Sequence, residues 1–384
     1  MRSKGPCMPG AESKTGKGGG LAAWVRRPGT MRWEPALEGL RGLACGMVFL
    51  FHLQTYLLGK GVPGSGWAET GWLAEWMARG AFGVPLFFLM SGYLFGAGSG
   101  RLEGGAQVPI FYRARLRRLY PAYAVNICTL WLCGLLQNVG KNGWRDLGSS
   151  LAGVSYWFNG QPSRINGVAW SLEVELQFYL VAPWLAIALA RLPARIRPWC
   201  LSGVGVLGLW LRDGAGFTDK TLLGNLHFFA GGWLLSVLGM KRETRGYCAP
   251  ALWDAAALCF LLGIRWIPAD ASGNQWLLLG WSGVLVAAAF FGRLWRGLLS
   301  LPALWVAGAM SYTVYLYHYP ILSFVGRLMA PVLQRVPPVF AAPVLGATTV
   351  VATALICSVL FHLFERPFFS RPGKSGVRAH SAAG

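Results

Sequence analysis

The sequence predicts an all-α fold, a polytopic integral membrane bundle of about ten transmembrane helices. Of its 384 residues, 54% are hydrophobic and 13% are charged, whereas a soluble domain carries about 25% charged residues. The apolar residues form continuous runs instead of an alternating pattern, which excludes an all-β barrel. The net charge of +20 has two interpretations: nucleic-acid binding, or basic cytosolic loops between membrane spans.

The individual spans are apolar segments close to the length of about 20 residues that a helix needs to cross a bilayer. The fifth segment is short and fits this length least well. In chain order, the predicted spans are 37–58, 81–96, 116–136, 168–190, 199–211, 222–238, 251–267, 276–291, 303–328 and 339–364.

The distribution of Lys and Arg indicates an even number of spans with both chain ends in the cytosol. With a cytosolic N-terminus, 24 of the 35 basic side chains fall on the cytosolic side, 10 on the outer side, and Arg41 within the first span. The positive-inside rule predicts this excess, which explains the net charge without nucleic acid. The predicted organisation is a disordered cytosolic tail over 1–32, a transmembrane domain over 33–370 and a second disordered cytosolic tail over 371–384.

The first span contains two ionisable side chains, Arg41 and His52. An ionisable group at membrane depth is costly, so it is expected to have a function. Eleven residues are about three helical turns, so the two share one face and lie about 16 Å apart along the axis. Arg41 is then near the cytosolic interface and His52 in the outer half of the bilayer. There His52 is either a functional group or a hydrogen-bonded packing residue.

The second span contains the small residues Ser91 and Gly92, which allow helices to approach closely. A serine nucleophile at this position would need a nearby base.

At the entry of the third span, the segment 111–121 carries four arginines. They either fix the topology alone or bind an anion, since Arg suits phosphate bidentately. Arg115 and Arg118 are three residues apart and share a helix face.

The fourth span opens with two acids, Glu173 and Glu175. On a helix they point about 200° apart, so they cannot form one carboxylate pair. Counted from its outer end, this helix places Glu175 in the outer half of the bilayer. Glu175 is either catalytic or one half of a structural ion pair.

The ninth span contains the tyrosine-rich stretch 311–320, with Tyr315 and His318. Counting from the cytosolic start of the span places His318 toward the outer side. The tyrosines form either an interfacial aromatic belt or a surface on which sugars stack.

The eight cysteines include no Cys-x-x-Cys pair, so neither a disulfide framework nor a zinc site is predicted.

Taken together, these blocks resemble the membrane-bound acyltransferase 3 family, the O-acyltransferases that modify bacterial glycans. The resemblance covers roughly residues 33–370, and five blocks follow the order of the family. Two positions depart from its pattern: Leu176 replaces a second acid that many members have after the glutamate, and Tyr93 replaces the usual Phe. The matching blocks are the pair Arg41 and His52 with ten residues between them, 83–93, the Arg-x-x-Arg element at 115–118 with 119–121, 170–179 and 311–320.

The resemblance implies an integral membrane O-acyltransferase that moves an acyl group, expected to be acetyl, from acyl-CoA to a hydroxyl of a carbohydrate or glycan acceptor. Acyl-CoA is then a co-substrate, with no permanently bound cofactor and no metal. The implied location is the bacterial cytoplasmic (inner) membrane, with both termini cytosolic. The implied partners are acyl-CoA, the glycan or glycolipid acceptor and the lipid bilayer, with no nucleic acid.

The resemblance also implies roles for individual residues. A neutral imidazole is competent near pH 7, so His52 is expected to act as general base on the acceptor hydroxyl. Glu175 would orient that imidazole or stabilise its protonated form, as the acid of a hydrolase triad does, or would only brace the helices. The arginines would bind the donor phosphates, and two residues of the ninth span would bind the acceptor. These further site residues are Arg41, Arg115 and Arg118 for the donor, and His318 and Tyr315 for the acceptor.

Two other classes of protein share parts of this pattern. A transporter or flippase for a lipid-linked saccharide is polytopic, but such folds are often built from inverted repeats with broken helices, and none is visible in the sequence. An unrelated membrane acyltransferase with one intramembrane histidine, or a rhomboid-like protease, is the other enzyme alternative. The protease needs a Gly-x-Ser-Gly stretch, which residues 97–100 do not match. The acceptor, the acyl chain length and the oligomeric state are left open.

Overall fold

The computed structural model describes residues 34–102, 105–136, 143–240, 249–268 and 274–368. Within these ranges the chain forms helices and no strand, which confirms the predicted all-α class. The predicted tails, 1–32 and 371–384, lie outside the described residues.

Each predicted span overlaps a helix of the structure. The first turn of α2, α9, α11, α14 and α16 holds a proline, which fits there because its missing N–H would have no partner inside the helix. The main helices are α2 (Pro35–Gly59), α4 (Gly83–Gly98), α5 (Val108–Leu136), α8 (Trp170–Ala190), α9 (Arg197–Asp213), α10 (Leu226–Val237), α11 (Pro250–Gly263), α12 (Gln275–Phe291), α15 (Ser311–Leu333) and α16 (Pro338–Leu360).

Shorter helices connect these elements and cover their ends. The last of them, η8, is a single π-helical turn that extends α16. They include α3 (Trp72–Ala78), η2 (Arg79–Phe82), α6 (Trp144–Leu151), α7 (Ser155–Asn159), η4 (Gly167–Ala169), η5 (Leu223–Asn225), α13 (Leu294–Leu299), α14 (Pro302–Ala309) and η8 (Phe361–Glu365).

Four helical stretches of the described chain are long and apolar enough to cross a membrane. The helix Gln275–Phe291 is apolar but shorter. The chain is therefore a multi-pass helical membrane protein. The four stretches are Pro35–Gly59, Trp72–Leu102, Gly167–Ala190 and Pro338–Phe368.

The ninth predicted span, 303–328, is divided in the structure. α14 ends at Ala309, α15 begins at Ser311, and the backbone of Met310 between them leaves the helical conformation at φ −93° and ψ 2°. The sequence predicted one span here because the whole segment 303–328 is long and apolar enough to cross a bilayer. The division allows α14 and α15 to follow different directions while both pack against α2.

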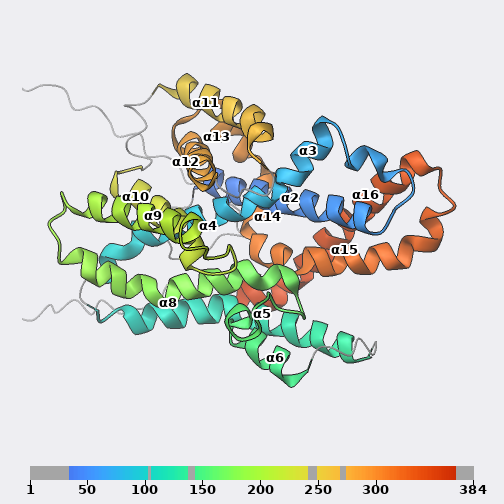
Figure 1. Cartoon of the computed structure of the whole chain (residues 1–384), viewed down its shortest axis with the longest axis horizontal. Coiled ribbons are helices and arrows are strands. Elements are labelled where there is room, and N and C mark those ends of the chain that lie inside the picture. The colour runs from blue at the N-terminus through green and yellow to red at the C-terminus, as the bar shows by residue number, and fades with distance from the viewer. Residues whose placement is uncertain (1–33, 103–104, 137–142, 241–248, 269–273, 369–384) are drawn as a thin grey trace, which may run out of the picture.

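Helix α2 lies among helices from both halves of the chain (Figure 1). It packs against α3, α4, α12, α13, α14 and α15. Helix α15 in turn packs against α16 and α5. The helix that carries Arg41 and His52 is therefore surrounded by protein along much of its length, and α15 reaches it directly.

Helices α4 and α10 approach each other closely, as the small residues of the second span predict. A Cβ atom added at Gly92 would collide with the backbone carbonyl of Phe229, and one added at Gly232 would collide with that of Leu89. The two glycines therefore face the opposite backbone, and no larger residue fits at either position without separating the helices.

Candidate active site

Two histidines from distant parts of the chain meet between α2 and α15. Nδ1 of His52 lies 2.9 Å from Nε2 of His318, and the ring centroids are 5.0 Å apart. His318 is buried, with 1% of its surface exposed, while His52 is partly exposed. We call these two residues the histidine pair. The sequence predicted both as site residues but could not predict that they touch.

Backbone carbonyl oxygens determine which ring nitrogen of each histidine in the pair carries the hydrogen. Nδ1 of His318 lies 2.7 Å from the carbonyl oxygen of Tyr315 and 3.1 Å from that of Val314. Nδ1 of His52 lies 3.0 Å from the carbonyl oxygen of Val48. Because a carbonyl oxygen only accepts, we assign a hydrogen to Nδ1 of each ring. A neutral His318 then accepts at Nε2 from His52, and Nε2 of His52 keeps a lone pair.

Aromatic rings surround the histidine pair. Tyr319 and Phe51 each have ring centroids 5.1 Å from that of His52, and Phe49 lies 6.4 Å from His318. An apolar shell of this kind limits the access of water and strengthens the hydrogen bonds inside it. Tyr319 is only partly buried, so its ring and that of His52 both reach the exposed edge of the site.

The turn of α15 that carries His318 is fixed from two other helices and a loop. The carbonyl oxygen of Leu316 accepts from the side-chain amides of Asn166 at 3.0 Å and Asn126 at 3.3 Å. The hydroxyl of Tyr315 accepts from that of Ser171 on α8 at 2.7 Å. Tyr315, a predicted acceptor-binding residue, is thus buried with 5% exposure and is bonded to the protein. The sequence analysis did not identify either asparagine as a site residue.

The predicted donor-binding arginine of α2 is mostly buried. The side chain of Arg41 is 14% exposed, and Nη1 lies 3.4 Å from a carboxylate oxygen of Glu38, one turn earlier. Arg41 also interacts electrostatically with Glu175 and Glu365. Since Arg41 and His52 are about three turns apart on α2, these acids gather at the end of α2 opposite to the histidine pair.

Glu175 makes its hydrogen bonds with α4 and with its own helix. Its Oε1 accepts from the hydroxyl of Ser91 at 2.7 Å and from that of Tyr179 at 2.6 Å. The guanidinium of Arg115 lies 4.6 Å from the ring centroid of Tyr179, a cation–π distance, and Arg118 interacts electrostatically with Tyr179. We call the following residues the arginine cluster: Arg41, Arg115, Arg118, Glu175 and Tyr179.

The neighbouring acid, Glu173, lies in a separate environment. Its carboxylate accepts from the backbone N–H of Ser155 at 3.0 Å and from the Ser155 hydroxyl at 2.7 Å. Both groups stand at the start of α7, so Glu173 caps this short helix. The two acids therefore face different partners, as their angular separation predicts, and Glu173 holds the segment around α7 against α8.

A further acid near the arginine cluster has no predicted role. Glu365 in η8 is fully buried and accepts from the hydroxyl of Thr313 at 2.8 Å. A buried carboxylate is unstable without partners, and Arg41 interacts with it electrostatically. Glu365 directly follows the predicted tenth span, 339–364, and a π-helical turn, which often marks functional sites, is not visible in a sequence.

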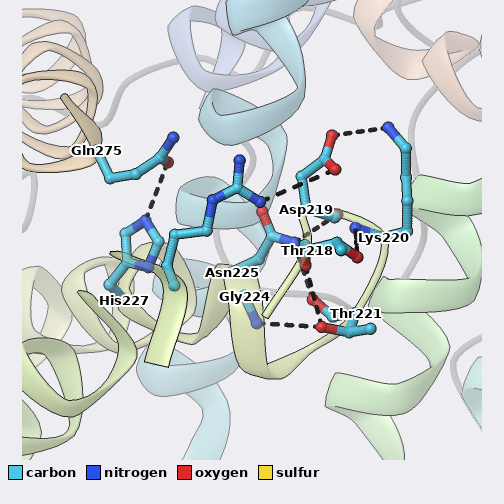
Figure 2. A network of polar contacts seen from close by, with 9 residues as sticks. Thr218, Asp219, Lys220, Thr221, Gly224, Asn225, His227 and Gln275 are labelled. Atoms are coloured by element: carbon cyan, nitrogen blue, oxygen red, sulfur yellow. Dashed lines mark hydrogen bonds and ion pairs between the residues drawn. The ribbon is translucent and has the colours of Figure 1, made fainter. Parts of the chain in front are cut away.

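A second polar network surrounds the loop between α9 and α10 (Figure 2). Nε2 of the buried His227 lies 3.4 Å from the amide oxygen of Gln275. Asp219 pairs with Lys220 at 2.7 Å, and the ammonium of Lys220 lies 3.7 Å from the ring centroid of Trp170. Asn225 donates to the carbonyl of Asp219 at 2.7 Å. These contacts fasten the loop to α8 and join α10 to α12, and we assign them a structural role.

The described residues contain no group of three or more His, Cys, Asp or Glu side chains that could hold a metal ion. A small cavity does border the arginine cluster, between α5, α8 and α15. It is lined by Leu119, Tyr120, Tyr123, Leu172, Glu175, Leu176 and Tyr312.

Comparison with known proteins decides the family. The family profile Acyl_transf_3, described as an acyltransferase domain, matches residues 34–363. The chain belongs to the acyltransferase 3 family. This membership confirms the resemblance carried by the five sequence blocks and identifies the chain as an acyltransferase.

Proteins of three bacterial species are similar to this chain over most of its length. The chain is 26% identical to the protein YrhL of Bacillus subtilis (strain 168), over 90% of the chain and 56% of that protein. It is 26% identical to the peptidoglycan O-acetyltransferase OatA of Listeria monocytogenes, over 88% and 56%. It is 24% identical to the O-acetyltransferase OatA of Staphylococcus aureus (strain NCTC 8325), over 88% and 57%.

The chain therefore spans a little over half the length of these acyltransferase 3 relatives. No solved structure matches it.

Proposed function

We propose that this chain is a membrane O-acetyltransferase that moves an acetyl group from acyl-CoA to a hydroxyl of a glycan, with His52 as the general base. The observation that carries the proposal is that Nδ1 of His52 contacts both the Val48 carbonyl and His318, from which we assign the hydrogen to Nδ1 and a lone pair to Nε2. Family membership supports the reaction class. The names of the relatives support acetyl as the group and peptidoglycan as the first acceptor to examine.

The transfer can proceed in one displacement without a covalent enzyme intermediate. Nε2 of His52 takes the proton of the acceptor hydroxyl as the oxygen attacks the thioester carbonyl carbon. The C–S bond then breaks, and the thiolate of CoA leaves and takes the proton back from the imidazolium. The ester product and free CoA account for all atoms, and His52 returns to its neutral form.

The arginine cluster is the proposed site for the phosphates of the donor. Arg41, Arg115 and Arg118 are the three predicted donor residues, and their charges gather around Tyr179 and Glu175. Guanidinium groups bind phosphates with two parallel hydrogen bonds. A distance of about 16 Å along α2 separates Arg41 from His52, which an extended pantetheine arm can bridge.

For Glu175 we propose a positioning role within the donor site. Its two hydrogen-bond partners, Ser91 and Tyr179, are at the arginine cluster, and Tyr179 carries Arg115 on its ring. The carboxylate thus holds the ring on which the guanidinium lies. This role replaces contact with the imidazole of His52, for which His318 supplies the partner.

We further propose a topology of about ten spans in the bacterial cytoplasmic membrane, with a transmembrane domain over 33–370 and both termini in the cytosol. A helix overlaps every predicted span, and the excess of basic residues on one side supports this orientation. The arginine cluster then lies toward the cytosol, where acyl-CoA is made, and the histidine pair lies toward the outer side, where a glycan acceptor is present.

Substitution of the base tests the proposed function. In proteoliposomes supplied with radiolabelled acetyl-CoA and muropeptides, His52→Ala should reduce acetyl ester formation about 100-fold or more, because general-base catalysis contributes at least that factor. Release of the CoA thiol should fall in parallel. The matched control is His227→Gln, which alters a buried histidine of the structural network on α10 and should retain activity.

Retained ester formation by a folded His52→Ala protein would refute His52 as the base. If the wild-type chain releases no CoA with muropeptides, the same assay with lipid-linked and polysaccharide acceptors tests the acceptor class separately.

A further inference from the structure

We infer that His318 is the positioning residue of the reaction, the partner that fixes the ring and the tautomer of His52. This inference rests on the proposed function and deepens it, because the sequence and the family resemblance assign His318 only to acceptor binding. The observation behind it is the contact of 2.9 Å between Nε2 of His318 and Nδ1 of His52.

The direction of this hydrogen bond is determined by the backbone of α15. Two carbonyl oxygens lie within 3.1 Å of Nδ1 of His318, so that nitrogen carries a hydrogen and Nε2 of the neutral ring can only accept. His52 must therefore donate from Nδ1, which leaves the lone pair at Nε2. Without this partner, only the carbonyl of Val48 at 3.0 Å would hold the hydrogen on Nδ1, and the ring would lose the second contact that fixes its orientation.

The same contact stabilises the product of proton transfer. When Nε2 of His52 takes the proton of the acceptor hydroxyl, the ring becomes an imidazolium with N–H groups on both sides. Its Nδ1–H then donates more strongly to the neutral His318, since hydrogen bonds from charged donors are about twice as strong as neutral ones. In a hydrolase triad a carboxylate does this; here a second, neutral imidazole does it without placing a buried negative charge beside the site.

The surroundings of His318 in this structure do not favour a role in acceptor binding. The side chain is 1% exposed, and both of its ring nitrogens are used within the protein. The turn around it is also held by Asn126, Asn166 and Ser171, which bond to residues 315 and 316. Such a fixed environment is expected of a residue that must hold another group at a defined angle.

Two substitutions of similar size separate positioning from packing. In His318→Gln, the amide oxygen can reach the place of Nε2 and accept from His52. In His318→Asn, the shorter amide can replace only Nδ1, so it donates to the Tyr315 carbonyl and leaves His52 without its partner. We expect kcat to fall about 100-fold in His318→Asn and less than about 10-fold in His318→Gln, with the KM values for acetyl-CoA and muropeptide unchanged in both.

The measurements use the full chain in proteoliposomes, with thermal unfolding in detergent to show that each variant is folded. His227→Asn, at the other buried histidine, is the matched control and should keep the wild-type kcat. A wild-type kcat in His318→Asn, or an equal loss in His318→Gln and His318→Asn, would overturn the inference. So would a rise in the KM for muropeptide at constant kcat, because that result assigns His318 to the acceptor. The proposed function fails separately, if His52→Ala remains active.

Discussion

The histidine pair and the arginine cluster each contain one residue of α2, but they are built in different ways. In the histidine pair, two neutral rings are held by hydrogen bonds of 2.7 to 3.1 Å, each with a defined direction. In the arginine cluster, hydrogen bonds hold Glu175 and Tyr179, whereas the guanidinium groups are held by an ion pair, by stacking and by electrostatic interactions. Geometry governs proton transfer, whereas charge governs the binding of an anion. Changes in the first region should therefore alter kcat, and changes in the second should alter KM.

Loss of Arg41 should give the largest change in KM. Arg41→Ala removes charge-assisted hydrogen bonds to the donor phosphates, which contribute about 1.5–3 kcal/mol, so the KM for acetyl-CoA should rise about 10- to 100-fold. The kcat at saturating donor should stay within about threefold, since the histidine pair is untouched. Initial rates of CoA release against donor concentration measure both values. Arg113→Ala, an exposed arginine of α5, is the control and should keep its KM.

A fall in kcat at constant KM for Arg41→Ala would contradict the division between the two regions. It would assign Arg41 to the chemical step instead of donor binding. Arg41→Lys helps to separate these outcomes, because Lys keeps the charge but not the two parallel hydrogen bonds. Its KM should lie between those of the wild type and Arg41→Ala.

The sequence allowed us to predict the helices and the residues that share a helix face, but not the contacts between residues far apart in the chain. The helices could be predicted because long apolar runs have few alternatives in a membrane, and Arg41 and His52 share a face because the helical repeat is fixed. The contact of His52 with His318 joins residues 266 positions apart, and that of Ser91 with Glu175 joins residues 84 apart. No periodicity carries such information.

Some of the missing information was nevertheless local. A histidine in a helix can donate to the carbonyls three and four residues earlier, as His318 does with Tyr315 and Val314. That pattern leaves Nε2 as an acceptor and suggests a donor partner, although not which one. The break at Met310 was not predictable from hydropathy, because it depends on how α14 and α15 pack against α2.

Removal of the Tyr179 hydroxyl, which holds the ring beneath Arg115, should change the KM for acetyl-CoA less than removal of Arg41. Tyr179→Phe keeps the ring beneath the guanidinium of Arg115 but removes the hydroxyl that donates to Glu175 at 2.6 Å. The loss of one such bond is about 1 kcal/mol, so we expect a rise of about fivefold in the KM for acetyl-CoA with little change in kcat. Tyr112→Phe is the matched control, because that hydroxyl donates to the carbonyl of Leu180 and does not contact Glu175.

If the KM for acetyl-CoA were unchanged in Tyr179→Phe but elevated in Tyr112→Phe, the proposed role of Tyr179 in the donor site would be wrong, and Tyr112 would have that role instead. A lowered kcat in Tyr179→Phe would instead connect Glu175 to the histidine pair, as the sequence alone suggested. The two residues therefore test whether Glu175 acts through Arg115 or through His52.

Added salt should cause the smallest change and requires no substitution. Raising KCl from about 0.05 M to about 0.5 M shortens the screening length to a few ångströms, which weakens the attraction between the arginines and the donor phosphates. Because Arg41 is mostly buried, and buried charges are screened less, the KM for acetyl-CoA should rise only about two- to threefold. The kcat should not respond, since the histidine pair is neutral before proton transfer and its hydrogen bonds are shielded by aromatic rings. A kcat that falls with salt at saturating donor would mean that a charged group takes part in the rate-limiting step. The histidine pair and the arginine cluster could then no longer be distinguished by the separate effects of salt on kcat and KM.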